Sequence, residues 1–412
     1  MVAKQFRVRR GSTMSKFHFS RRGFVQMTFG SALTGLWSAL GVQISKASSR
    51  RNTNPGNRTR LRDLGITIGR LPTGLHNAIT DVEGVRVGHT TNISGSGRLI
   101  VGEGPIRTGV TAILPRSGNV YREKLPVGGF ILNGNGELTG LLNTLNDGLL
   151  ETPIFLTGTA NVGIVYDAAL TYLLQEHPEI GVTERVPVPV VGECWDSLGD
   201  IQGRHLSEDD VLRAIASAAD GPVEEGAVGG GTGMRSYGFK SGIGTSSRRI
   251  PANRGGYTVG VLVNANHGSR HLLRVDGVPV GEELLRYPED EVEKSKSIII
   301  VAATDAPLLP IQLNRLCKRL AMGLAKTGSV STHGSGDVFI AFSTVPRSSD
   351  ENVSWTGDNG VSSLWEAASE ATEEAILNAL TAAPTMDGAN GSIRHALPLD
   401  RLTEIMKKYN RL

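Results

Sequence analysis

Several short runs of β-branched and other apolar residues, separated by glycine-containing turns, constrain the fold of this chain most strongly. Most of them are apolar at nearly every position, which is typical of strands covered on both faces by other layers. The runs span residues 109–114, 129–132, 186–191, 257–263, 297–303 and 338–342. Pro187 and Pro189 place the third run at a sheet edge or in an extended loop.

Two helices are predicted among these runs. The first spans Pro310–Lys326, where leucines form one stripe, proline stands at the start and Gly328 follows the end. In the second, Ser363–Leu380, Leu364 and several alanines face one way and acidic residues the other. Strands and helices alternate without a repeat or an internal linker, so residues 61–412 are expected to form one α/β domain of layered sheets and helices.

The first 47 residues have the organisation of an export signal. Ser20–Val25 has the twin-arginine pattern S-R-R-x-F-hydrophobic, and the 23 residues Gly23–Ser45 carry no charge before the small residue Ala47. This order predicts twin-arginine export to the periplasm or the medium, followed by a polar linker over residues 48–60. A retained membrane anchor is the alternative, which the polar residues in the uncharged stretch disfavour. Translation from Met1 and from Met14 both remain open.

Charge and cysteine content argue against several kinds of partner and site. Residues 1–47 contain eight Lys or Arg and no Asp or Glu, so the formal charge falls from +3 to −5 without them. A mildly acidic body argues against a nucleic-acid partner. Cys194 and Cys317 have no metal-binding spacing, and buried free thiols are favoured over a disulfide. No metal or other cofactor is expected.

Common catalytic motifs are absent from the sequence: it has no G-x-S-x-G, no H-E-x-x-H and no phosphate-binding loop. The glycine-rich run Val228–Met234 lacks the Lys-Ser/Thr of such a loop, so tight packing around a turn is favoured over anion binding. His267 and His333 are each isolated and receive no role.

The segment Glu291–Pro310 contains a sharp boundary at Ser297, where a charged run ends and an apolar run begins, in the sequence EVEKSKSIIIVAATDAPLLP. Cleavage before Ser297 would place a hydroxyl beside a new α-amine. The amine, with a pKa near 7.7–8.0, can take the hydroxyl proton and thereby activate the nucleophile. The pattern alone favours an ordinary exposed loop before a strand.

Blocks of sequence spread over residues 60–405 favour cleavage before Ser297 over an ordinary exposed loop. Together and in this order, they resemble the DmpA-type aminopeptidases, which comprise L-aminopeptidase/D-amidase-esterases and β-peptidyl aminopeptidases. The blocks include Arg62–Ile66, Val85–His89 (VRVGH), Asn133–Glu137 (NGNGE), Val228–Met234, Thr258–Asn266 (TVGVLVNAN), Ile299–Pro310 and Gly334–Thr344 (GSGDVFIAFST).

The resemblance implies an αββα sandwich similar to N-terminal-nucleophile hydrolases. It also implies autocatalytic cleavage into residues 48–296 and 297–412, and a homotetramer of cleaved protomers. The implied function is that of a serine aminopeptidase or amidase, which releases N-terminal amino acids from small peptides, amino-acid amides or esters.

Carried over position by position, the resemblance places the nucleophile at Ser297. Ser335 and Asp337 match residues that hydrogen-bond around the nucleophile and its amine. Asn266 matches the amide that donates to the oxyanion, and such a donor is worth about 3–4 kcal/mol of transition-state stabilisation.

Glu193 lies in the block Val190–Asp196, which matches a site-lining loop, and is expected to pair with the ammonium group of the substrate. Trp195 stands where relatives can place a tyrosine that assists the oxyanion. Its indole can donate a hydrogen bond there but does not ionise as a phenol does. For both positions, a structural role at a strand end is the alternative. Lys296 stands where the resemblance predicts glycine. Glycine permits the strained backbone that self-cleavage can use, so lysine is expected to make the cleavage less efficient. Ser295 is a rival nucleophile.

Two other functions remain open at this stage. One is a self-cleaving acyltransferase similar to ornithine acetyltransferases, although these use threonine and work in the cytoplasm. The other is an uncleaved, non-catalytic periplasmic binding protein. Preference for L- or D-, and for α- or β-amino acyl groups, depends on pocket shape and is not predicted.

Overall fold

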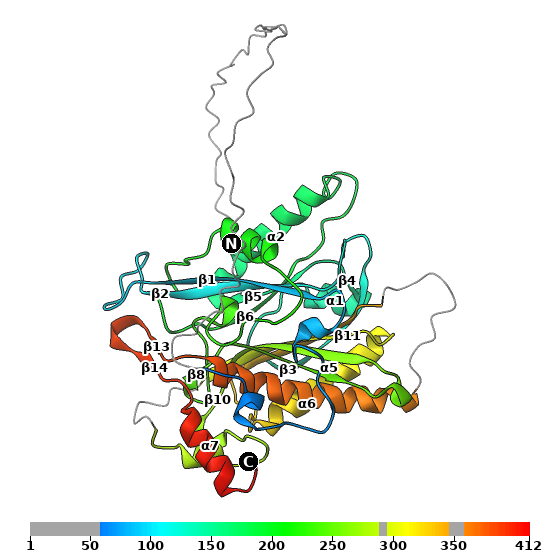
Figure 1. The fold of residues 1–412 in the computed structure, drawn as a ribbon. Helices are drawn as coiled ribbons and strands as arrows, with labels where there is room; N and C mark the ends of the chain where they lie inside the picture. The colour runs from blue at the N-terminus through cyan, green and yellow to red at the C-terminus, as the bar shows by residue number, and fades with distance from the viewer. Residues whose placement is uncertain (1–57, 288–294, 346–357) are drawn as a thin grey trace, which may run out of the picture. The chain divides into compact units, whose positions relative to one another are not determined.

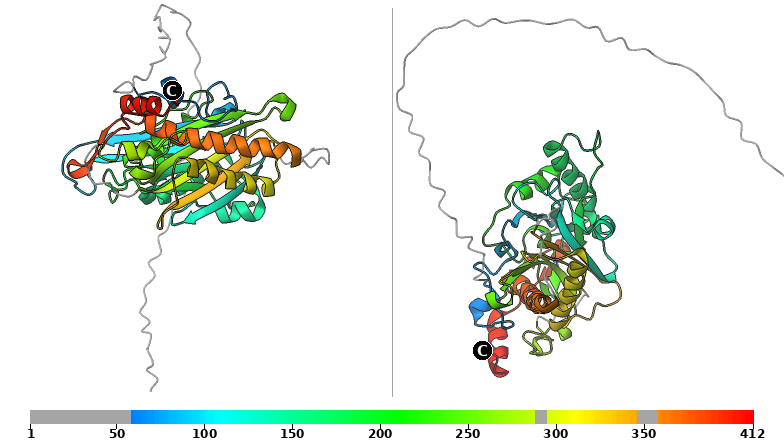
Figure 2. Two further views of the ribbon diagram at one scale, coloured as in Figure 1. Left: turned by 90° about the horizontal axis from the view of Figure 1, so that it is seen from below. Right: turned by 90° about the vertical axis from the view of Figure 1, so that its right-hand side faces the viewer.

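The computed structural model describes residues 58–287, 295–345 and 358–412, which belong to one compact unit. In this unit two β-sheets are stacked face to face, and helices cover the outer face of each (Figure 1; Figure 2). Three apolar clusters fill the spaces between the resulting layers. The predicted αββα sandwich is therefore confirmed. The expected export signal and all but the last residues of the expected linker lie outside the described residues.

The larger sheet has six strands and carries the boundary at Ser297. In spatial order these strands are β4 (Leu149–Leu150), β3 (Leu125–Gly134), β12 (Gly336–Ser343), β11 (Ser295–Thr304), β10 (Thr258–Gly268) and β9 (Ile243–Arg249). Only β11 and β12 run parallel among these neighbours, and helix α5 (Pro310–Lys326) connects them, because parallel neighbours need a crossover.

The smaller sheet has four strands. In spatial order they are β1 (Arg86–Ser94), β2 (Ile106–Leu114), β5 (Ile154–Gly158) and β6 (Val190–Cys194). The edge strand β6 begins directly after Pro189, so the two prolines lie in the extended segment before it, as the sequence indicated. The strand itself continues to Cys194, which places the expected site-lining residues at its end.

Helices α5 and α6 (Asp358–Ala382) cover the larger sheet, and helices α2 (Val162–Glu176) and α3 (Glu208–Ala216) cover the smaller one. The bounds of α5 are those that the sequence predicted. The remaining helices and short strands are α1 (Leu141–Asp147), α4 (Val280–Glu283), α7 (Leu399–Lys408), β7 (Arg235–Ser236), β8 (Phe239–Lys240), β13 (Met386–Asp387) and β14 (Ile393–Arg394).

Two acidic residues of α6 lie inside the protein and have cationic partners there. Glu370 and Glu374 are buried, and the guanidinium of Arg248 on β9 lies against both. Arg248 Nε is 3.0 Å from Glu370 Oε2, and Arg248 Nη2 is 2.7 Å from Glu374 Oε2. Arg62 adds a second ion pair to Glu374, at 2.7 Å. Buried carboxylates persist here because each has a cationic partner.

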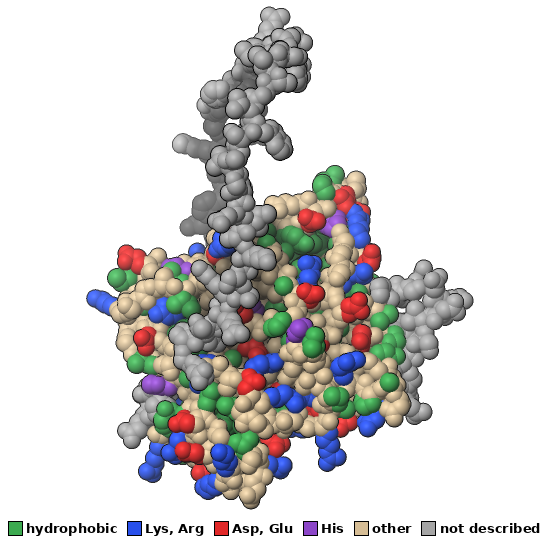
Figure 3. All heavy atoms as spheres, viewed as in Figure 1, with side chains coloured by type: hydrophobic (Ala, Val, Ile, Leu, Met, Phe, Trp, Pro, Cys, Tyr) green, Lys and Arg blue, Asp and Glu red, His purple; other side chains and the backbone are tan. Residues whose placement is uncertain are grey.

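The cysteines and the surface complete the description. Cys194 and Cys317 are free and buried, as predicted. On the face shown in Figure 3, basic and acidic side chains are interspersed. Within the described ranges, no helix is long and apolar enough to cross a membrane.

Candidate active site

Ser297 lies near the start of β11, between two strands that carry other predicted site residues. Asn266 of β10 is its antiparallel neighbour, and Gly336 of β12 is its parallel neighbour. Ser297 is buried, and its Oγ accepts a hydrogen bond of 3.4 Å from the backbone N–H of Gly336. No other hydrogen bond of this hydroxyl is found among the described residues, and none of these residues supplies a base in contact with it.

Strand alternation sets the face on which Ser297 acts. Ile299 and Val301, which alternate in phase with Ser297, belong to the apolar cluster between the two sheets. Asn266 is directly opposite Ser297 in an antiparallel pair, so the two side chains lie on the same face. The nucleophile and the predicted oxyanion donor therefore both face the smaller sheet.

The amide of Asn266 is held in one orientation by its two neighbours. Its Oδ1 accepts a hydrogen bond from the backbone N–H of Arg235 at 3.1 Å. Its Nδ2 donates to the backbone carbonyl of Trp195 at 3.1 Å. Since an amide nitrogen carries two hydrogens, one N–H remains for an oxyanion.

Ser335 and Asp337 flank Gly336 and bond to each other. Ser335 Oγ donates to Asp337 Oδ1 at 2.6 Å, and both side chains are buried. Burial raises the pKa of Asp337, and the Ser335 hydroxyl partly offsets this. The structure thus brings the pair beside the backbone group that contacts Ser297, but no hydrogen bond joins either side chain to Ser297 in the described part of the intact chain.

Glu193 lies on β6, one residue before the end of the strand, and Trp195 directly follows the strand. Glu193 is buried, and its carboxylate accepts hydrogen bonds from the backbone N–H of Glu137, at 3.0 Å, and from the hydroxyl of Thr159. Burial raises the pKa of Glu193, while these two donors lower it. The side chain of Trp195 is 44% exposed, so its contribution to the Asn266 contact comes from its backbone.

Sequence reasoning missed Asp196, which anchors the same segment. Its Oδ2 accepts a hydrogen bond of 2.8 Å from Thr108 on β2. Burial raises the pKa of Asp196 to about 7. A Cβ on Gly158 would lie 2.2 Å from Asp196 Oδ2, so that glycine is required by the close approach of the carboxylate. Trp195 and Asp196 together link the two sheets, because one contacts β10 and the other β2.

The two isolated histidines differ in burial. His267 is buried beside Asn266, and burial lowers its pKa to about 3, so its ring is neutral. It packs edge-on against Tyr237, with ring centroids 5.1 Å apart. His333 is exposed.

The glycine-rich run packs as predicted. A Cβ on Gly230 would lie 2.4 Å from the carbonyl oxygen of Leu156, and one on Gly231 would lie 2.3 Å from the backbone nitrogen of Ile243. The segment therefore serves close backbone packing between the sheets. Among the described residues, no group of three or more His, Cys, Asp or Glu side chains is arranged to hold a metal ion.

Comparison with known proteins agrees with this arrangement. The sequence pattern of peptidase family S58 matches residues 77–394. The beta-peptidyl aminopeptidase BapA of Sphingosinicella microcystinivorans is 45% identical over 379 residues, which cover 86% of this chain and 93% of that protein.

Two solved structures share the fold. The PH0078 protein from Pyrococcus horikoshii OT3 superposes with a TM-score of 0.81 at 47% identity, over 86% of this chain and 100% of that one. The l-aminopeptidase d-ala-esterase/amidase from Ochrobactrum anthropi gives 0.78 at 38% identity, over 86% and 99%. The latter is described as a prototype for the serine aminopeptidases and a new variant among the ntn hydrolase fold.

The αββα sandwich of this chain is thus the fold of a hydrolase, the variant of the ntn hydrolase fold that the Ochrobactrum anthropi protein represents. The chain belongs to peptidase family S58, and it is a serine aminopeptidase, a hydrolase that acts on peptide bonds.

Proposed function

We propose that the chain cleaves its own peptide bond between Lys296 and Ser297, and that Ser297 then releases N-terminal residues from small peptides, amides or esters. One observation carries the proposal: Ser297 Oγ lies between the Gly336 N–H and the Asn266 amide, yet has no base in contact among the described residues. A hydroxyl so placed lacks only a proton acceptor, and cleavage before Ser297 would create one in its own α-amine.

In self-cleavage, Ser297 Oγ attacks the carbonyl carbon of Lys296, the hydroxyl proton passes to the backbone nitrogen of Ser297, the C–N bond breaks, and an ester forms. Water then hydrolyses the ester, which leaves a carboxylate on Lys296 and a free amine on Ser297. The side chain of Lys296 lies outside the described residues, so the effect of lysine in place of glycine is left to experiment.

In turnover, the α-amine of Ser297 takes the hydroxyl proton as Oγ attacks the substrate carbonyl. The free N–H of Asn266 stabilises the resulting oxyanion, and the amine passes the proton to the leaving group. Water then releases the acyl group by the reverse sequence. Ser335 and Asp337 hold the new amine in place, since cleavage brings a donor next to their buried, hydrogen-bonded pair.

Glu193 is the proposed anchor for the free ammonium group of the substrate. An ionised carboxylate has about four lone-pair positions, and Glu137 and Thr159 occupy two of them. The remaining positions suit an ammonium group, which would also restore a counter-charge to a buried acid. The exposed ring of Trp195 lines the approach to this position.

The names of the relatives guide the choice of substrate. BapA is called a beta-peptidyl aminopeptidase, so we include β-amino acyl amides among the proposed substrates. Hydrolysis of β-alanyl p-nitroanilide, compared with the L-alanyl compound and with its N-acetylated form, tests this. Only substrates with a free amine should be turned over.

Export and assembly complete the proposal. The twin-arginine pattern at Ser20–Val25 supports export to the periplasm, and the family resemblance supports a homotetramer. Changing both Arg21 and Arg22 to Lys should retain a fused reporter in the cytoplasm. Light scattering of the purified protein should give four times the protomer mass, and a monomer would contradict the assembly.

A denaturing gel tests the cleavage. The enzyme is expected as fragments of 249 residues (48–296) and 116 residues (297–412), whereas Ser297→Ala should stay intact and inactive. Ser295→Ala is the matched control and should be cleaved and active. Cleavage that persists in Ser297→Ala would show that another residue is the nucleophile.

A further inference from the structure

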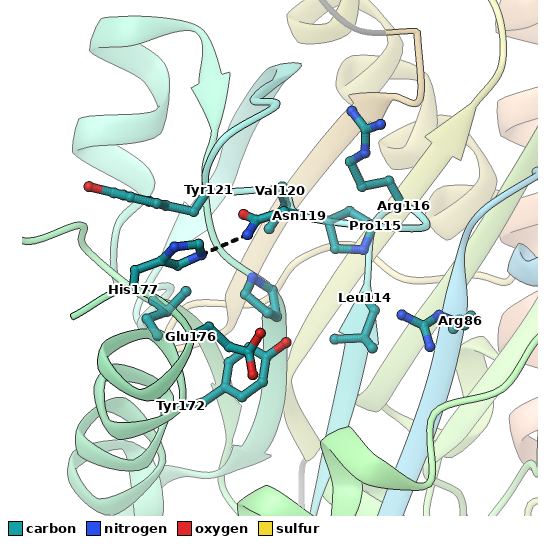
Figure 4. Close-up of a pocket in the computed structure, with 13 residues that line it drawn as sticks. Arg86, Leu114, Pro115, Arg116, Asn119, Val120, Tyr121, Tyr172, Glu176 and His177 are labelled. Atoms are coloured by element: carbon teal, nitrogen blue, oxygen red, sulfur yellow. Dashed lines mark hydrogen bonds between the residues drawn. The ribbon is translucent and has the colours of Figure 1, made fainter. Parts of the chain in front are cut away.

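A second cavity lies at the end of β5 that points away from Ser297. Its volume is about 320 Å³, and it is lined by the start of β1, the end of β2 and the loop that follows, the residue before β5 and the C-terminal end of α2 (Figure 4). Pro153, just before β5, borders the cavity, whereas Thr159, just after β5, hydrogen-bonds to Glu193. The five residues of β5 therefore separate the two regions by about 17 Å.

Most polar groups around this cavity are satisfied by one another. Asn119 Nδ2 and His177 Nε2 share a hydrogen bond and lie 2.8 Å apart. Arg116 forms an ion pair with Glu123, and the Tyr121 hydroxyl donates to Glu184 at 2.8 Å.

Three groups are exceptions. Arg86, Tyr172 and Glu176 make no side-chain hydrogen bond or ion pair with any residue that the structure describes. Arg86 is half-buried, and its Nε is shielded from solvent without an acceptor. A bound anion would give the guanidinium the acceptor that its shielded Nε lacks, and a charged acceptor makes the strongest hydrogen bonds with Arg.

The charges of the cavity are separated. Arg86 stands on one side, while Glu176 and the C-terminal end of the 15-residue helix α2, which favours a cation, stand on the other. In Figure 4 the Tyr172 hydroxyl and the Glu176 carboxylate point together, with the Arg86 guanidinium across from them beyond Leu114. Burial and then Glu176 raise the pKa of Tyr172, while Arg86 lowers it, so the hydroxyl is a donor within electrostatic reach of both charges.

We propose that this cavity binds a free amino acid with an apolar side chain, at a site separate from the catalytic one. The carboxylate would meet the Arg86 guanidinium and the Tyr172 hydroxyl, and the ammonium group would meet Glu176. The side chain would lie on the apolar wall formed by Leu114 and Pro153. Neither hydrolysis nor cleavage is needed for this binding, so it stands or falls independently of the proposed function.

Calorimetric titration with L-leucine tests the proposal, in the full-length chain carrying Ser297→Ala so that no ligand is hydrolysed. Two analogues separate the two charges: 4-methylpentanoate lacks the ammonium group, and leucinamide lacks the carboxylate. Arg86→Gln should weaken binding of leucine and 4-methylpentanoate by at least about tenfold, and Tyr172→Phe should weaken both to a smaller extent. Glu176→Gln should weaken leucine but leave 4-methylpentanoate unchanged.

The exposed Arg98→Gln is the matched control and should bind leucine as the parent does. The proposal is overturned if leucine does not bind, or if binding is lost in Glu193→Gln and kept in Arg86→Gln, which would place it in the active site. It is also overturned if Arg86→Gln changes the oligomeric state and not leucine binding, because the cavity would then be part of a subunit interface.

Discussion

Two regions of this protein bury carboxylates, and they do so in opposite ways. On α6, Glu374 is fully buried, and although burial alone would raise its pKa, Arg62 and Arg248 lower it. Around Ser297, burial raises the pKa of Glu193, Asp196 and Asp337, and none of these forms an ion pair with Lys or Arg among the described residues. The first region uses its acids for stability. The second keeps its acids without internal cations, next to where we propose that an amine binds or forms.

Removal of Arg248 gives the largest expected effect on the stability side of this comparison. Arg248→Ala leaves Glu370 and Glu374 buried without this partner, so the free energy of unfolding should fall by about 3–5 kcal/mol. Denaturant unfolding measures it. Arg254→Ala, whose contact with Glu366 is exposed and 4.0 Å long, is the control and should change stability by less than about 1 kcal/mol. An equally small loss of unfolding free energy in Arg248→Ala would show that the ion pairs of α6 do not stabilise the fold.

On the catalytic side, Asn266→Ala should lower kcat by about 10²–10³-fold, or about 2.7–4 kcal/mol, because the oxyanion loses its side-chain donor. Steady-state kinetics of an amino-acid p-nitroanilide measures this on protein confirmed to be cleaved. The exposed Asn146→Ala serves as the control and should retain the parental kcat. A rise in KM with kcat unchanged would assign Asn266 to ground-state binding instead.

Glu193→Gln sharpens the contrast, since it should reduce function without reducing stability. Loss of the charge-assisted bond to the substrate ammonium should lower kcat/KM by about 1.5–3 kcal/mol, or roughly 10–100-fold. The melting temperature should not fall, because the carboxylate has no internal cation. Glu103→Gln, on the surface, is the control. A large fall in melting temperature would show that Glu193 stabilises the fold, as the acids of α6 do.

The last prediction concerns Asp196 and the dependence of stability on pH. Its pKa of about 7 in the folded protein lies above the ordinary value of 3.8, so the folded state binds the extra proton between these values. Stability from this group is therefore greatest at low pH and falls as pH rises from about 4 to about 7.

Asp196→Asn should remove that decline. Its free energy of unfolding relative to the parent should increase from pH 4 to pH 8, because only the parent loses stability as this carboxyl ionises. Unfolding curves at both pH values measure this, with the exposed Asp209→Asn as control. A difference that does not change with pH would mean that the Asp196 carboxylate is ionised throughout.

Local patterns predicted the elements but not the charges between them. The apolar runs and the stripe of α5 anticipated the central strands and that helix, because periodicity and end signals are local. The ion pairs of the acidic residues of α6 were not predicted, since nothing near them in sequence reveals Arg248, which β9 brings from more than a hundred positions away. Asp196 was missed for the same reason, as its partner Thr108 and its neighbour Gly158 come from other strands.

The site residues were predicted from the family resemblance and not from local patterns. Register between strands decides that Asn266 and Gly336 flank Ser297, and no local pattern specifies register. The structure adds to the resemblance the fixed orientation of the Asn266 amide and the absence, among the described residues, of any base touching the Ser297 hydroxyl.

The central claim is that Ser297 becomes both the nucleophile and the N-terminal residue of its own fragment. N-terminal sequencing and intact mass of the purified protein test it most directly. The account predicts a small fragment that begins Ser-Ile-Ile-Ile and contains 116 residues, present in every active preparation. A fully active protein that remains one uncleaved chain, or a small fragment that begins at Ser295, would contradict it.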